Sequence, residues 1–423
     1  MSPSPVEVSG PVVGASGAPS PGSGRFPNIE GMRAIAALSV VVYHTTIHYN
    51  IASTEYATWS LIDRFGNFGV SMFFLISGLL LYRPYVVAHF ADAAPPDLRS
   101  FWRRRFFRIL PGYWLALVGV LVLGFEHIHD LSEVFMAGLL LQNYRFGYEL
   151  FGIGVEWTLV IEVSFYLALP AIAAVIRRAG RATELRAKLR VQLCGLAVLY
   201  GIAVVTRIWF LWVLDPMHHV PSMAKGTWFP LVQVSQWLVG YLDWFALGML
   251  LAVASAWSAA GGRLPWQLEM LGRYPWASWL VAFATYWVAL QLHLPVSVFE
   301  YTTRTQAFGI SLTYGFVAFF MLVPTVFGPQ DAGLIRRLLQ SRVLRFLGSI
   351  SYGTYLWHMI VVKQVERWTH HGVVPLDYFV WLALVFAITL PIATLSWYFV
   401  EKPLIAVSHR RRRAGVSRAP RSS

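Results

Sequence analysis

Apolar residues are gathered in runs of helix length, and short polar or basic segments separate one run from the next. An α-helix needs about 20 mostly apolar residues to cross the hydrocarbon core of a bilayer. About ten runs reach that length, at residues 31–49, 67–88, 107–125, 155–176, 191–214, 232–257, 274–293, 306–328, 347–365 and 377–400. The pattern predicts an all-α fold, a polytopic membrane helix bundle with about ten transmembrane helices.

A shorter apolar segment at residues 135–144 is too short to cross the bilayer as a helix. We expect it to be re-entrant or interfacial. Basic clusters follow the second run, precede the fifth and the ninth, and close the chain, at residues 99–108, 177–190, 336–345 and 410–413. With ten crossings, every cluster falls on the side of the N-terminus, as the excess of Lys and Arg in cytoplasmic loops requires. We therefore expect a multi-pass protein of the plasma (inner) membrane with both termini cytoplasmic.

Composition supports a membrane protein, because 57% of the residues are hydrophobic and only 13% are charged, against roughly 25% charged in soluble domains. The net charge of +13 comes from short clusters between apolar runs, so we expect the lipid bilayer as a partner and no nucleic acid. The single cysteine, Cys194, excludes an intrachain disulfide and a cysteine-based zinc cluster. The histidine pairs lack a carboxylate at suitable spacing, so we expect no metal.

The two ends of the chain differ from the apolar runs. Residues 1–25 are rich in Pro, Gly and Ser and lack the basic and apolar regions of a secretory signal, so we predict a disordered N-terminal tail. Residues 26–406 then form one membrane domain. Residues 407–423 are expected to be a basic cytoplasmic tail.

The first apolar run carries two cationic side chains, Arg33 and His44, which lie eleven residues apart. That spacing is about three helical turns, so both point to nearly the same side of one helix, about 16 Å apart along it. Ionisable groups in a membrane span mostly face the bundle interior or an aqueous cavity. Each of the two residues can have a functional or a structural role. In the structural interpretation, His44 is an imidazole packed in the core and Arg33 is an anchor at the membrane interface.

Glu162 is the acidic residue that the predicted topology brings to a similar depth as His44, which lies roughly 20 Å from the cytoplasmic end of its run. The two side chains can therefore meet inside the membrane, as a catalytic pair or as a structural bridge. Tyr166 is one turn from Glu162 on the same face, and Trp157 lies near the outer interface. We also predict an ion pair between Arg207 and Asp243.

Arg105 and Arg108 are i, i+3 neighbours that precede Pro111 at the cytoplasmic end of the third run. Guanidinium pairs bind phosphate bidentately. The alternative is that the pair only sets the topology.

Several sequence blocks, in this order and spacing, resemble the acyltransferase-3 family of integral membrane O-acyltransferases from about Phe26 to Ala406. The blocks are EGMRAIAALSVVVYH, GVSMFFLISGLLLYR, RFFRILP beginning at Arg105, WTLVIE followed by FY at Phe165 and Tyr166, LGSISYGTYLWH ending at His358, and SWYFVEKP.

The resemblance implies transfer of an acyl group, often acetyl, from acyl-CoA to a hydroxyl of a carbohydrate, glycolipid, antibiotic or cell-envelope polymer. It implies that His44 is the catalytic histidine and that Arg33, Arg105 and Arg108 bind or position the donor. Some relatives carry a further soluble hydrolase-like domain, which we expect to be absent here. Acyl-CoA is expected as a donor substrate, and no tightly bound cofactor is expected.

The chemistry suits these residue types. We expect His44 to act as general base on the acceptor hydroxyl, and Glu162 to orient the imidazole or to act as a second acid or base. Substrate-binding positions are expected at Trp157, Tyr166, Tyr355 and His358, although Tyr355 and His358 suit helix packing equally well.

Three alternatives stay open. The acyl group can pass first to a protein nucleophile, but no residue marks that nucleophile, and Cys194 is far in depth from His44. A proton-coupled transporter or flippase of an envelope precursor also suits buried Arg, His and Glu residues, although no inverted repeat is visible. The third alternative is a non-catalytic scaffold, and no feature of the sequence favours it.

Overall fold

The computed structural model describes residues 26–49, 68–126, 129–145, 148, 151–180, 184–214, 236–291, 304–370 and 377–408. Across these ranges the regular structure is helical, which confirms the all-α prediction. The predicted N-terminal tail and most of the predicted basic tail lie outside the described residues.

Ten long helices follow the ten predicted runs. They are α1 (Ile29–Tyr49), α3 (Phe68–Phe90), α4 (Leu98–Val122), α6 (Trp157–Ala179), α7 (Leu185–Trp209), α9 (Leu242–Ala259), α11 (Pro275–Gln291), α12 (Arg304–Val326), α15 (Ser351–His370) and α16 (Tyr378–Ser396). In the described part of the chain, 7 helices are long and apolar enough to cross a membrane. The helices α1, α11 and α15 are not among them, because α11 has 17 residues and the other two carry several ionisable groups.

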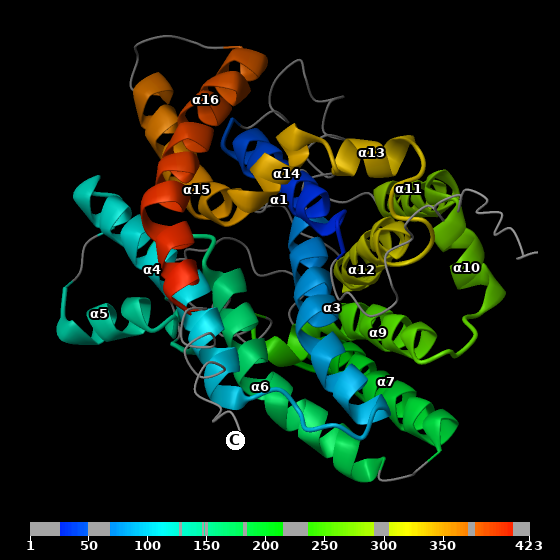
Figure 1. Cartoon of the computed structure of the whole chain (residues 1–423). Helices are drawn as coiled ribbons and strands as arrows, with labels where there is room; N and C mark the ends of the chain where they lie inside the picture. The colour runs from blue at the N-terminus through cyan, green and yellow to red at the C-terminus, as the bar shows by residue number, and fades with distance from the viewer. Residues whose placement is uncertain are drawn as a thin grey trace, which may run out of the picture.

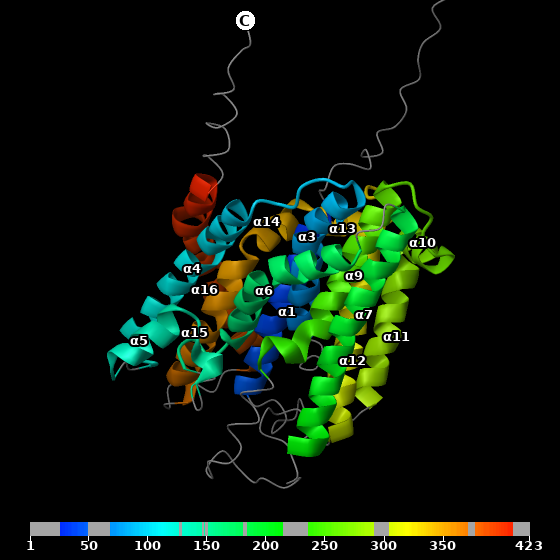
Figure 2. The same cartoon turned by 90° about the horizontal axis from the view of Figure 1, so that it is seen from below.

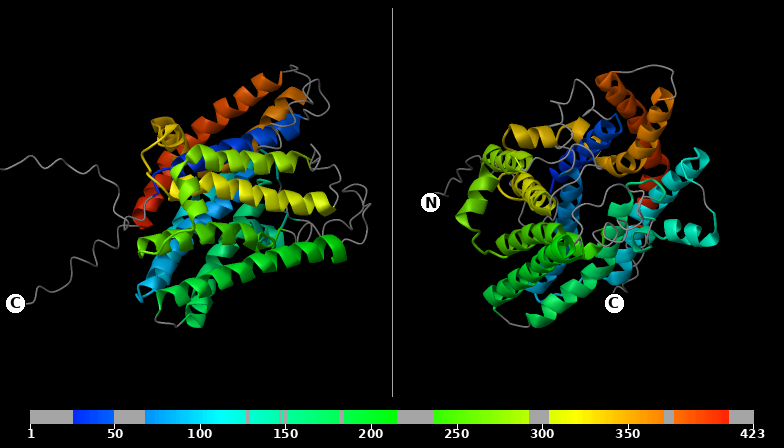
Figure 3. Two further views of the ribbon diagram at one scale, coloured as in Figure 1. Left: turned by 90° about the vertical axis from the view of Figure 1, so that its right-hand side faces the viewer. Right: turned by 180° about the vertical axis from the view of Figure 1, so that it is seen from behind.

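Shorter elements connect or extend these helices. They are α5 (Leu131–Gly138), η3 (Gln142–Tyr144), η4 (Phe210–Leu214), η6 (Leu238–Tyr241), α10 (Trp266–Arg273), α13 (Leu334–Leu339), α14 (Arg342–Ser349) and η7 (Trp397–Glu401). The long helices lie side by side (Figure 3). The short helices α10, α13 and α14 lie together at one end of the bundle (Figure 2).

The segment predicted at residues 135–144 forms α5 and η3, and its helix begins earlier than expected because Asp130 caps it, accepting a hydrogen bond from the Glu133 N–H at 3.0 Å. Eight residues span only about 12 Å. The segment packs beside α4 (Figure 1), where the Tyr113 hydroxyl donates to the Ala137 carbonyl at 2.8 Å. It is therefore shorter than a membrane-crossing helix.

Helix α1 lies among α3, α14, α15 and α16 (Figure 1). Its start is held by side-chain amides: Asn28 donates to Gln330 Oε1 at 2.7 Å and accepts from Gln340 at 3.0 Å. A Cβ on Gly31 would lie 2.3 Å from the Leu339 carbonyl oxygen, so α1 and α13 meet backbone to backbone. The first turn of α1 is therefore tightly clamped by the α12–α13 region.

Helices α3 and α9 also approach through glycines. A Cβ on Gly78 would lie 2.4 Å from the Phe245 carbonyl oxygen, and one on Gly248 would lie 2.0 Å from that of Leu75. Small residues allow this close backbone packing between membrane helices. The predicted Arg207–Asp243 ion pair is confirmed beside it, with 3.0 Å between Nη1 and Oδ2, and it joins α7 to α9.

The glycine contact generates a paired test. We expect Gly248→Ala to destabilise the protein by about 1–3 kcal/mol, because the methyl group overlaps the α3 backbone. Gly201→Ala on α7 is the matched control: among the described residues no atom lies within 4 Å of its Cβ position, so the change should be neutral or stabilise by up to about 1 kcal/mol. Thermal unfolding in detergent measures both, and equal midpoints for the two variants would contradict the close approach.

Candidate active site

A cavity of about 210 Å³ lies between α1, α3, α4, α6 and α15. It brings together six residues that the sequence analysis singled out: Arg33, Arg105, Arg108, Glu162, Tyr166 and Tyr355. They come from four helices, so the bundle gathers in one place residues that are far apart in the chain.

Glu162 has a defined position in this cavity. Its Oε1 accepts hydrogen bonds from the Ser77 hydroxyl on α3, at 2.6 Å, and from the Tyr166 hydroxyl one turn along α6. The Arg105 guanidinium lies 5.8 Å from the centre of the Tyr166 ring, within cation–π range. Two donors on one oxygen therefore hold the carboxylate between α3 and α6.

The arginines make the cavity cationic. Arg33 lies 3.6 Å from Glu30, with 15% of its side chain exposed, and it interacts electrostatically with Arg108. Arg108 has no hydrogen bond within the described ranges. Three guanidinium groups outnumber the carboxylates of Glu30 and Glu162. Like charges in one small cavity repel each other, and a bound anion would relieve that repulsion.

His44 lies outside the lining of this cavity. Its Nδ1 is 3.0 Å from the Val40 carbonyl oxygen and 3.2 Å from Nε2 of His358 on α15. The predicted contact with Glu162 is not found within the described residues, because Ser77 and Tyr166 hold that carboxylate. His44 and Glu162 were predicted to lie at similar depth in the membrane. Similar depth does not determine whether the two side chains lie on the faces of α1 and α6 that point toward each other.

The imidazole pair adjoins the cavity through Tyr355. This tyrosine lines the cavity, and its ring centre lies 5.6 Å from that of His358. Its hydroxyl lies 2.7 Å from Thr158 Oγ1 and donates to the Val155 carbonyl at 3.0 Å. Tyr355 is thus the wall between the carboxylate and the two histidines.

The hydrogen bonds assign the tautomers of both neutral histidines. His358 Nδ1 lies 3.2 Å from the Thr354 carbonyl oxygen, which can only accept, so Nδ1 carries the proton. Nε2 of His358 then accepts from Nδ1–H of His44. Nε2 of His44 is left with its lone pair, which is the form a general base needs.

Trp157 is placed elsewhere. It lines a separate cavity of about 330 Å³ with Arg207 and Trp244, and its ring centre is 5.8 Å from that of Tyr241. The structure does not place it in the lining of the Glu162 cavity, because the first turn of α6 packs this ring against Tyr241 at the end of η6.

Sequence reasoning missed three polar residues of the site. Ser77 and Tyr352 line the cavity, and Tyr352 donates to the Ile109 carbonyl at 2.7 Å. Glu401, in the block SWYFVEKP, was not among the predicted site residues, yet it is buried and interacts electrostatically with Arg108 and Arg33. The π-helical turn η7 ends on Glu401 and turns it inward, where Ser396 donates to it at 3.0 Å. In the sequence, the Ser77 hydroxyl within the second apolar run could have indicated a polar residue of the site.

A metal-based site receives no support from the geometry. Within the described ranges, no group of three or more His, Cys, Asp or Glu side chains could hold a metal ion.

Comparisons with known proteins give a family match and several relatives. A family model described as an acyltransferase domain matches residues 26–398. The chain is 24% identical over 397 residues to the peptidoglycan O-acetyltransferase OatA of Listeria monocytogenes, covering 89% of this chain and 55% of that protein. It is 26% identical over 399 residues to the putative peptidoglycan O-acetyltransferase YrhL of Bacillus subtilis, covering 90% and 55%. The chain spans about half the length of these two relatives.

A third relative is similar in length. The chain is 24% identical over 410 residues to nodulation protein 10 of Rhizobium leguminosarum bv. viciae, covering 90% of this chain and 94% of that protein. No solved structure matches the chain significantly. The family match spans nearly all the helices that build the cavity and the imidazole pair, and with the apolar helices it identifies a multi-pass membrane protein. This chain therefore belongs to the acyltransferase-3 family of membrane acyltransferases.

Proposed function

We propose that the protein transfers an acyl group, acetyl or another short acyl, from acyl-CoA to a hydroxyl of a carbohydrate, glycolipid or related cell-envelope or secondary-metabolite acceptor. The observation that carries this proposal is the cationic cavity around Glu162 with an oriented histidine pair at its wall. Relatives named as peptidoglycan O-acetyltransferases support a glycan acceptor and an acetyl group.

The donor is proposed to enter from the side of the arginines. Coenzyme A carries phosphate groups, and the guanidinium groups of Arg33, Arg105 and Arg108 bind phosphate through paired hydrogen bonds. Arg108 suits this role because it lines the cavity and its guanidinium makes no hydrogen bond within the described part of the chain. The thioester then reaches inward toward Glu162 and the Tyr355 wall.

His44 is proposed as the general base. Its Nε2 removes the proton from the acceptor hydroxyl while the hydroxyl oxygen forms a new bond to the thioester carbon. The carbon–sulfur bond breaks, and the coenzyme thiolate takes the proton back from the imidazolium. The Val40 carbonyl and Nε2 of His358 stabilise the imidazolium at Nδ1–H. Glu162 is proposed as a second acid or base on the cavity side.

The proposed topology has ten crossings, with both termini on the cytoplasmic side of the plasma membrane. It includes α1, α11 and α15 as crossing helices. Among the described residues, Arg177 and Lys188 lie at the end of the bundle where α3 ends and α4 begins, next to Ala93 and Asp92, which fits the bias of Lys and Arg toward cytoplasmic loops.

The first test removes the base. We expect His44→Ala to lower acyl-CoA turnover by at least about 100-fold, because general-base catalysis typically contributes that much. His48→Ala is the matched control: it lies one turn further along α1, and its imidazole is paired with Glu366 at 2.8 Å, so turnover should stay near that of the wild type. Turnover is measured on purified protein by release of free thiol. A folded His44→Ala protein with full turnover would exclude His44 as the base, and a wild-type protein without any acyl-CoA turnover would favour a carrier.

The second test addresses the histidine pair. His358→Leu removes the acceptor for Nδ1–H of His44, and we expect kcat to fall about tenfold or more while KM for acyl-CoA stays unchanged. His358→Gln keeps a carbonyl oxygen that can accept that hydrogen bond, so it should retain most of kcat. If both variants lose kcat equally while remaining folded, His358 acts in packing and not in orienting His44.

The third test addresses the donor site. Arg108→Gln should raise KM for acyl-CoA about tenfold or more, because a charge-assisted hydrogen bond to phosphate is lost. Arg108→Lys keeps the charge but not the planar fork and should fall in between. Arg345→Gln on the exposed face of α14 is the control and should leave KM unchanged. An unchanged KM in Arg108→Gln would place the coenzyme elsewhere.

A further inference from the structure

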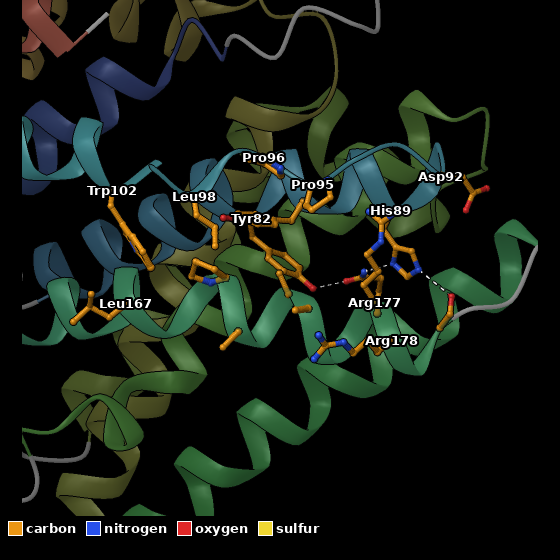
Figure 4. Close-up of a pocket in the computed structure, with 17 residues that line it drawn as sticks. Tyr82, His89, Asp92, Pro95, Pro96, Leu98, Trp102, Leu167, Arg177 and Arg178 are labelled. Atoms are coloured by element: carbon orange, nitrogen blue, oxygen red, sulfur yellow. Dashed lines mark hydrogen bonds between the residues drawn. The ribbon is translucent and has the colours of Figure 1, made fainter. Parts of the chain in front are cut away.

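A second, larger cavity of about 830 Å³ opens beside the Glu162 cavity. It is a groove between the last turns of α3, the start of α4 and the C-terminal half of α6 (Figure 4). Leu167 and Trp102 lie toward one end of the view, and His89, Arg177 and Asp92 lie toward the other. We call it the α3–α4–α6 groove.

The groove continues the active-site cavity along the same three helices. On α3 the lining changes from one cavity to the other between Leu81 and Tyr82, and on α6 between Tyr166 and Leu167. The Arg105–Tyr166 contact lies at this boundary. A ligand in the groove would therefore lie next to the proposed donor site without entering it.

The wall of the groove is apolar and open to the surface of the bundle. Leu98, Trp102 and Leu167 are 44%, 43% and 63% exposed, which suits contact with lipid chains. From Leu167 to Arg177, α6 rises about 15 Å, which equals one leaflet of a hydrocarbon core about 30 Å thick. The apolar part of the groove thus matches the length of acyl chain in one leaflet.

The far end of the groove is cationic. Arg177 Nη1 donates to the Ala93 carbonyl at 2.8 Å, and Arg178 has no hydrogen bond within the described residues. The carboxylate of Asp92 is already paired with the Lys188 ammonium at 2.6 Å, and that hydrogen bond lowers the pKa of Asp92. Asp92 is therefore hydrogen-bonded to Lys188, and within the described residues it makes no hydrogen bond to either arginine.

Three polar side chains that line the groove, Tyr82, Gln192 and His89, are hydrogen-bonded to one another, whereas the buried Tyr85 hydroxyl has no hydrogen-bond partner among the described residues. The Tyr82 hydroxyl donates to Gln192 Oε1 at 2.6 Å, and Gln192 Nε2 lies 2.7 Å from Nδ1 of His89. Nε2 of His89 in turn donates to the Gly180 carbonyl at 3.1 Å. These groups do not compete with the arginines for an anionic ligand.

We propose that the α3–α4–α6 groove binds an anionic phospholipid of the adjacent leaflet, with its phosphate on Arg177 and Arg178 and one acyl chain along Leu167, Pro170 and Ala174. Basic pockets between membrane helices bind anionic headgroups, and guanidinium groups favour phosphate. A phospholipid fits better than the coenzyme, because the groove is apolar over the thickness of a leaflet and open to the outer surface of the bundle. The site is separate from the proposed chemistry.

The test measures binding of phosphatidylglycerol to the purified full chain by native mass spectrometry, with phosphatidylcholine of the same chains as reference. We expect the double variant Arg177→Gln/Arg178→Gln to weaken phosphatidylglycerol binding about 30-fold and to leave phosphatidylcholine binding unchanged. The matched control is Arg342→Gln/Arg345→Gln, which removes two exposed arginines from α14 and should bind as the wild type does.

A second pair of variants fills the groove without changing its charge. Ala174→Trp should block phosphatidylglycerol binding, whereas Val175→Trp, on the neighbouring residue outside the groove, should not. Equal binding by Ala174→Trp and Val175→Trp would overturn the proposal. Equal binding of sn-glycerol 3-phosphate and phosphatidylglycerol would overturn it too, by assigning a phosphate site without a lipid chain.

The result also separates the lipid from the coenzyme. If Arg177→Gln/Arg178→Gln raises KM for acyl-CoA while phosphatidylglycerol still binds normally, the groove is part of the donor site and the lipid proposal fails. If Arg177→Gln/Arg178→Gln loses lipid binding while its KM for acyl-CoA stays at the wild-type value, the groove is a lipid site. This conclusion holds whichever acceptor the protein uses.

Discussion

The free-energy cost of a charge or an unpaired polar group in hydrocarbon governs where the ionisable side chains of this bundle lie. Glu162 is held by Ser77 and Tyr166, and Arg207 is held by Asp243. Because no single helix can supply all these partners, the polar faces of several helices converge on the interior. The cavity is the result of that convergence, and the three guanidinium groups that line it suit the phosphate-bearing donor proposed above.

The histidine pair also avoids an unpaired polar group in hydrocarbon, but it does so without a charged partner. Among the described residues His44 has no carboxylate partner, and its proton on Nδ1 is shared between a backbone carbonyl of its own helix and the imidazole of His358. This arrangement needs no second charge in the membrane. It also leaves Nε2 of His44 available to accept a proton, so the packing of α1 against α15 and the proposed role of His44 as a base depend on the same hydrogen bonds.

Much of the fold could be predicted from the sequence because helix length and apolar content are local properties. The ten runs became the ten long helices, and six predicted residues meet in one cavity. The partner of His44 and the place of Trp157 could not be predicted, because both depend on the rotation of a helix about its axis, which packing decides. Glu401 was missed because a π-helical turn changes the face on which it lies.

Helix α1 carries both Arg33 and His44, and its first turn is clamped to α13 through Gly31 and to the side-chain amides around Asn28. A helix anchored in this way cannot swing or turn about its axis without breaking those contacts. Any opening that admits substrates must therefore come from its neighbours, such as α4 and α6. In such a cycle α1 would hold His44, the proposed base, at a fixed position while the neighbouring helices move.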